Sequence, residues 1–121
     1  MSGDVYVLTN IAMPRIVKIG HSFDAELRAQ QLSWATGVPC NFDVAYAQHV
    51  DYAPEVESAA HELLADYRVN DRREFFYTRP ANAVSAIQIA ALVVAWNRAG
   101  KDAREEFLLR IERPIMDQQF A

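Results

Sequence analysis

The chain has little of the chemistry that cross-links a fold, because its 121 residues include one cysteine, Cys40. A single thiol excludes an intrachain disulfide, and no repeated Cys/His spacing of the zinc-site kind is present. After Met1 there is no basic stretch followed by an apolar run, so no secretory signal is expected. These absences predict a protein of the reducing cytoplasm.

Long hydrophobic runs and an excess of positive charge are also missing. The longest apolar stretch, residues 87–96, is too short to cross a bilayer, which predicts a soluble protein. Twelve Lys and Arg stand against sixteen Asp and Glu, a net charge of −4. That balance argues against a broad basic surface for nucleic acid, although a cleft lined by a few arginines can still hold a phosphate.

Three common catalytic motifs are absent: a glycine-rich phosphate loop, a nucleophile elbow and a His-Glu-x-x-His pattern. Their absence excludes P-loop nucleotide hydrolysis, serine-hydrolase chemistry and zinc peptidase chemistry. The polar residues left for chemistry are Tyr6, Lys18, His21, Arg28, Glu57, His61 and Glu74.

The length and the 51% hydrophobic content predict one folded domain of ordinary globular composition. Residues 4–9 and 15–20 are rich in β-branched and aromatic side chains, which predicts a hairpin with Tyr6 and Leu8 on one face. Alternation over residues 42–47 predicts a third strand, and residues 74–78 a short final one.

Four helices are expected between and after these strands. The first begins at Ser22 or Asp24, both good N-cap residues, and ends near residues 37–39. The second begins at Pro54, with Glu57 and His61 at the edge of its buried face. Its predicted inward stripe is Val56, Ala60, Leu63 and Tyr67.

The C-terminal part is predicted to be a helical extension, residues 80–121, attached to a domain of residues 1–79. Its first helix is apolar almost all round from residue 83 to 96, so it must be covered on most sides, either by the sheet or by another subunit. A last helix follows Gly100, with predicted inward residues Ala103, Phe107, Leu108 and Ile111.

Several short motifs occur along the chain. In order, they are Val5-Tyr6-Val7, Lys18-Ile19-Gly20, Arg28 four residues before Leu32, Ala35-Thr36-Gly37-Val38-Pro39, Glu57 four residues before His61, Tyr67-Arg68-Val69 and Arg73-Glu74-Phe75-Phe76. Together they resemble the GIY-YIG nuclease superfamily, in the small-domain, phage-type branch whose second motif reads KIG. The resemblance covers roughly residues 4–78.

This resemblance implies an α+β fold with a small three-stranded antiparallel sheet flanked by helices. It also implies a metal-dependent endonuclease or nickase acting on DNA, with one Mg²⁺ or Mn²⁺ carried by Glu57. By motif position, Tyr6 acts near the attacking water and Arg28 contacts the scissile phosphate. Lys18 stands where the superfamily has its second tyrosine, and His61 completes the candidate catalytic set.

Simpler interpretations remain open at this stage. Tyr6 alone is an ordinary strand residue, Arg28 a surface side chain, and Glu57 with His61 a solvated helix edge. His21 is expected to be structural or exposed, and Glu74 to anchor Arg73 or Arg28. Two other functions are a catalytically silent GIY-YIG fold that binds nucleic acid or protein, and a regulatory protein that forms homodimers through its C-terminal helices.

Overall fold

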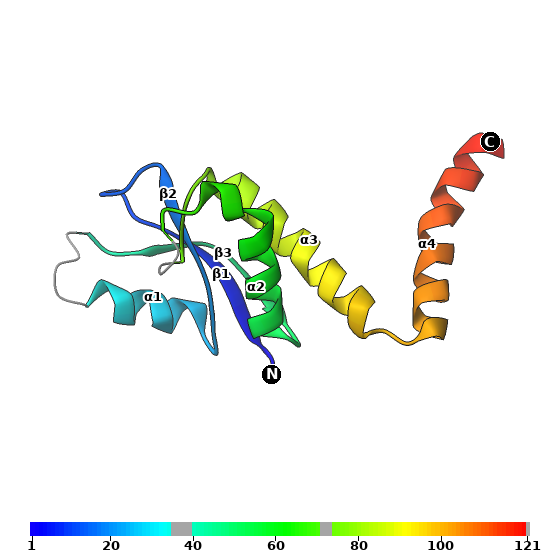
Figure 1. Cartoon of the computed structure of the whole chain (residues 1–121), viewed down its shortest axis with the longest axis horizontal. Coiled ribbons are helices and arrows are strands. Elements are labelled where there is room, and N and C mark those ends of the chain that lie inside the picture. The colour runs from blue at the N-terminus through cyan, green and yellow to red at the C-terminus, as the bar shows by residue number, and fades with distance from the viewer. Residues whose placement is uncertain (35–39, 71–73, 121) are drawn as a thin grey trace.

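The computed structural model describes residues 1–34, 40–70 and 74–120, with side chains as far as residue 110 (Figure 1). One antiparallel sheet has the order β3-β1-β2-β4. Its strands are β1 (Gly3–Thr9), β2 (Ile16–Ser22), β3 (Asp43–Val50) and β4 (Phe75–Tyr77). The α+β class is confirmed, and β4 is the short final strand predicted at residues 74–78, one strand more than the resemblance implies. The motif at residues 35–39 and Arg73 of the last motif lie outside the described residues.

The β1–β2 hairpin has the faces that its alternating sequence predicted. Tyr6 lies opposite Gly20, and Leu8 lies opposite Lys18. Because directly opposite residues in an antiparallel pair project from the same face, these four share one side of the sheet. Val5 and the other β-branched residues of the hairpin therefore face the other side.

Helices cover both faces of the sheet. On the Tyr6 face, α1 (Ala25–Ser33) packs Ala25 and Ala29 against Tyr6 and Leu8. This helix begins as predicted, because the side chain of Asp24 accepts a hydrogen bond from the Leu27 N–H. On the opposite face, α2 (Ala53–Leu63) and α3 (Pro80–Arg98) cover a larger cluster built from Val5, Val7, Val17, Ile19, Phe76 and Ile87.

The predicted inward stripe of α2 is partly wrong. Val56 and Ala60 are buried, but Leu63 and Tyr67 are 51% and 55% exposed, whereas Leu64 is buried. The reason is that α2 ends at Leu63 and the chain continues as a tighter 3₁₀ helix, Ala65–Tyr67, which turns Tyr67 outward. The buried row therefore includes Glu57, which is 7% exposed and not at a solvated edge.

The first C-terminal helix is divided between core and surface. Its buried side chains, Ala83, Ala86, Ile87 and Ala90, belong to the same core as the sheet. The helix α3 is long and apolar enough to span a membrane. Among the described residues, no other helix meets both criteria. One such helix is weak evidence for a membrane span, and the buried side chains of this one pack into the core beside the sheet.

The last helix, α4 (Lys101–Phe120), stands apart from the sheet in Figure 1. It meets α3 through the rings of Phe107 and Trp96, whose centroids are 5.7 Å apart, and through Arg104, which donates to the Trp96 carbonyl. Phe107 and Leu108 are 40% and 46% exposed, so the prediction that they point inward is wrong. An amphipathic pattern shows which face is apolar but not what covers it. The side chain of Ile111 lies outside the described residues.

Candidate functional site

Tyr6 lies in the middle of β1, with its side chain 1% exposed. Its ring occupies the space above Gly20, since a Cβ atom built at Gly20 would lie 2.4 Å from the Tyr6 hydroxyl oxygen. Only a residue without a side chain leaves room for the tyrosine there. The glycine of the KIG motif therefore has a physical role, which is to let the Tyr6 ring cross β2.

Arg28 reaches Tyr6 from α1. It lies next to the buried Ala29 but is itself exposed, and its guanidinium hydrogen bonds with the Tyr6 side chain. Because a guanidinium has only donors, the Tyr6 oxygen is the acceptor and the Tyr6 proton stays available for donation. The remaining N–H groups of Arg28 suit a phosphate.

The protonation of Tyr6 differs from what a catalytic base requires. Burial raises the pKa of Tyr6 to about 12, and the charges of Glu74 and Glu57 add to the rise, while the hydrogen bond with Arg28 opposes it. Tyr6 in this state is a neutral hydrogen-bond donor. It fits the stabilisation of a developing negative charge better than the removal of a proton from water.

Glu57 points from α2 towards β2. One carboxylate oxygen, Oε2, is hydrogen bonded to Nδ1 of His21, and the other, Oε1, lies 3.5 Å from Nε2 of His61. The carboxyl group of Glu74 also lies within hydrogen-bonding reach. Burial raises the pKa of Glu57 to about 7, the hydrogen bond with Glu74 adds to the rise, and His21 opposes it. Because the pKa of Glu74 is lowered, the proton that the pair holds in mildly acidic solution resides on Glu57.

His61, predicted as catalytic, holds α2 against the sheet. Its Nε2 donates to the main-chain carbonyl of Ile19 at 2.9 Å, and its ring packs on Phe76 with centroids 5.0 Å apart. Burial lowers the pKa of His61, although the hydrogen bond to Ile19 partly opposes this. A neutral imidazole bound to a carbonyl fixes α2 against β2.

Lys18 forms the best-defined ion pair of the site. Its Nζ lies 2.9 Å from Oε2 of Glu74, and its side chain is 12% exposed. The ammonium also lies 5.2 Å from the centre of the Phe75 ring, a cation–π distance. Burial acts to raise the pKa of Glu74, but the hydrogen bonds with Glu57 and Lys18 and the Lys18 charge together bring it below its usual value.

The structure thus forms two groups from the predicted residues. Tyr6 and Arg28 hydrogen bond to each other, and Lys18 and Glu57 are connected through Glu74. Glu74 can connect Lys18 and Glu57 because it lies just before β4, next to β2. Its main-chain oxygen accepts a hydrogen bond from the Ile19 N–H at 3.0 Å. The charges of Glu57 and Glu74 also act on Tyr6, which places both groups in one electrostatic environment.

His21 and Glu74 have roles that their sequence positions did not indicate. His21 is exposed, as expected, and its ring also hydrogen bonds to Glu57. Glu74 was expected to anchor Arg73 or Arg28; it pairs with Lys18, and Arg73 lies outside the described residues. The alternation of β2 offered a signal for His21, because it lies two residues after Ile19 and so on the face that α2 covers.

Glu57 is the residue that was expected to carry a divalent cation. Among the described residues, no group of three or more His, Cys, Asp or Glu side chains is arranged to hold a metal ion. Magnesium is commonly bound by one or two carboxylates and completes its shell with water and substrate phosphate oxygens. Glu57 is the carboxylate that would hold such an ion, while Glu74 is paired with Lys18.

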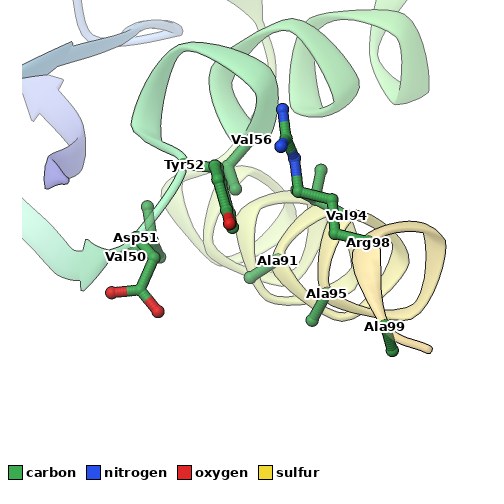
Figure 2. A pocket seen from close by; sticks show the side chains of 9 residues that line it. All are labelled: Val50, Asp51, Tyr52, Val56, Ala91, Val94, Ala95, Arg98 and Ala99. Atoms are coloured by element: carbon green, nitrogen blue, oxygen red, sulfur yellow. The ribbon is translucent and has the colours of Figure 1, made fainter. Parts of the chain in front are cut away.

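A separate cavity lies between the β3–α2 turn and the C-terminal half of α3. It encloses about 410 Å³ and includes none of the candidate residues (Figure 2). Arg98 lies on the Tyr52 ring, 3.8 Å from its centre, and 3.4 Å from Glu55. The arginine of this cavity therefore has an aromatic ring and a carboxylate as neighbours.

The structure is a small α+β domain with a partly buried polar cluster at one edge of its sheet. Residues 3–96 match the T5orf172 domain, and the chain belongs to that family. This phage-type domain is often linked to nuclease-like proteins, which suggests a role in cutting or binding DNA. Comparison with curated proteins and with solved structures found no match.

Proposed function

We propose that this domain is a GIY-YIG-type endonuclease or nickase that hydrolyses DNA phosphodiester bonds with one Mg²⁺ or Mn²⁺. The main support is the connection from Lys18 through Glu74 to Glu57, because it brings a cation and a candidate metal carboxylate from distant parts of the chain to one edge of β2. Tyr6 and Arg28 add donors from the neighbouring face.

Each side chain has a defined task in this proposal. Arg28 binds a non-bridging oxygen of the scissile phosphate, and Tyr6 donates its proton in a hydrogen bond to the oxygen that gains charge. Lys18 lies ready to neutralise the departing oxygen. Glu57 carries the cation, which supplies positive charge for the phosphoryl oxygens when bound. His21 orients Glu57 through a hydrogen bond, and His61 holds the helix that carries Glu57 against the sheet.

The test is cleavage of supercoiled, branched and single-stranded DNA with Mg²⁺ or Mn²⁺, using wild type beside Glu57→Gln. The amide keeps the size of the side chain but loses the charge that a cation requires. Glu55→Gln is the matched control, because Glu55 lies on the same helix and pairs with Arg98 away from the site. Equal cutting by wild type and Glu57→Gln would identify a contaminating nuclease and reject the proposal.

The second candidate is a catalytically silent fold that binds nucleic acid. The high pKa of Tyr6 favours it, because no described group draws the Tyr6 proton away. Specific DNA binding by wild type, without cutting under any of these metal conditions, would support this alternative. With a net charge of −4, such binding is expected to be weak and sensitive to salt.

A further inference from the structure

Glu74 is placed to act on more than one member of the candidate site. Its main chain is fixed at the edge of β2 by the hydrogen bond from Ile19, and its carboxylate binds the Lys18 ammonium at 2.9 Å. The neighbouring residue, Phe75, lies below the same ammonium. Two consecutive residues thus hold the end of one lysine side chain.

We propose that Glu74 is a positioning residue, which holds the Lys18 ammonium where the departing oxygen of a cleaved phosphodiester would lie. This inference rests on the proposed nuclease function. A lysine has a flexible stem of four carbons, and fixing its end before the substrate arrives removes a loss of conformational freedom from the reaction. The structure supports fixation, because Lys18 is mostly buried while Glu74 is 41% exposed and open to the solvent side.

Three roles of Glu74 can be distinguished by measurement: positioning Lys18, binding the metal, and stabilising the fold. If Glu74 works through Lys18, its removal matters only while the Lys18 charge is present. If it is a metal ligand, its removal weakens metal binding with or without Lys18. If it is only structural, its removal lowers stability and leaves the catalytic rate of the folded protein unchanged.

A double-mutant cycle separates these roles. Glu74→Gln, Lys18→Met and the double variant are compared with wild type for cutting rate and for Mn²⁺ affinity by calorimetry. We expect kcat to fall about 10-fold in Glu74→Gln, with KM and Mn²⁺ affinity within about threefold of wild type. In the Lys18→Met background, the same Glu74→Gln change is expected to alter kcat by less than about twofold.

Two results of the cycle would overturn the proposal. One is a full 10-fold loss from Glu74→Gln in the absence of Lys18, and the other is a Mn²⁺ affinity lowered 10-fold or more. If wild type cuts no DNA, the nuclease function fails, and the geometric part of the inference is judged by a readout that does not depend on activity.

That readout is the chemical reactivity of Lys18. The chain has two lysines, Lys18 and Lys101, so mass spectrometry after treatment with an amine-acylating reagent reports on Lys18 with the exposed Lys101 as an internal reference. We expect Glu74→Gln to raise the Lys18 rate at least threefold relative to Lys101, and Glu55→Gln to leave it unchanged. Equal Lys18 rates in wild type and Glu74→Gln would show that Glu74 does not hold the ammonium.

Discussion

The two faces of the sheet are covered by side-chain clusters of different size. The face under α2 and α3 is the thick face, and the face under α1 is the thin face. Among the described residues, thirteen buried side chains form the cluster under α2 and α3, and four form the cluster under α1. The thin face consists of Tyr6 and Leu8 packed against two alanines of α1. The thick face includes Phe76 and Ile87, which are fully buried.

This difference assigns separate duties to the two faces. Because buried apolar area is the main source of folding free energy, the thick face provides most of the stability. The small alanines of α1 bring this helix close to β1, so that Arg28 reaches Tyr6. The edge of β2, where the faces meet, is where Glu74 contacts Lys18. Substitutions can therefore separate stability from activity.

The largest expected effect is on the thick face. Phe76→Ala removes a fully buried ring from the centre of the cluster and is expected to lower the free energy of unfolding by about 3–5 kcal/mol. Urea denaturation followed by circular dichroism measures this change. Leu8→Ala on the thin face serves as the comparison, and a larger loss there than at Phe76 would reverse the assignment of stability to the thick face.

Tyr6→Phe addresses the thin face. The substitution keeps the ring above Gly20 and removes the hydroxyl, so we expect DNA cutting to slow by about 10²–10³-fold, as for the loss of one donor to a developing charge. The free energy of unfolding is expected to change by about 1 kcal/mol, the contribution of one hydrogen bond. Single-turnover cleavage kinetics and denaturation measure the two effects, and unchanged cutting would remove Tyr6 from the mechanism.

The two faces of the β1–β2 hairpin could be predicted from the sequence, because side chains in a strand alternate between faces with a period of two residues. Tyr6 and Leu8 were placed on one face by alternation alone, and both belong to the cluster under α1. The burial of Glu57 could not be predicted in this way, since a carboxylate next to an apolar stripe normally lies at its solvated edge. Its partner His21 lies 36 residues away in sequence, on another element. Only the packing of α2 across β2 reveals the contact.

The pH dependence of cation binding tests the role of Glu57 beside β2. Glu57 has a pKa of about 7, so it is protonated in acid and gains the charge that a cation requires as the pH rises through 7. We expect Mn²⁺ affinity to increase from pH 6 to pH 8, with calorimetry as the measurement. An affinity that stays constant over this range would show that Glu57 does not bind the cation.

The same shift affects stability in the opposite direction. The raised pKa of Glu57 means that the metal-free folded state binds more protons than the unfolded state between about 4.5 and 7. The contribution of Glu57 to stability is therefore fully present below pH 4.5 and is lost as the pH rises through 7. Thermal melting of metal-free protein should show this loss in wild type and a smaller one in Glu57→Gln, and equal pH profiles would contradict the assignment of the proton to Glu57.

The smallest expected effect is at the exposed side of α3, which belongs to neither face of the sheet. Ile89, Leu92 and Val93 are 49%, 59% and 46% exposed, and adjacent apolar side chains of this kind often form contacts between subunits. We expect wild type to form a weak homodimer whose mass in light scattering rises with concentration, and Leu92→Glu to remain a monomer. Because Leu92 lies away from Tyr6, Lys18 and Glu57, the cutting rate of this variant should stay within about twofold of wild type, the change expected of a surface substitution outside the site. A monomeric mass for wild type at every concentration would leave the exposed side of α3 without a role in self-association.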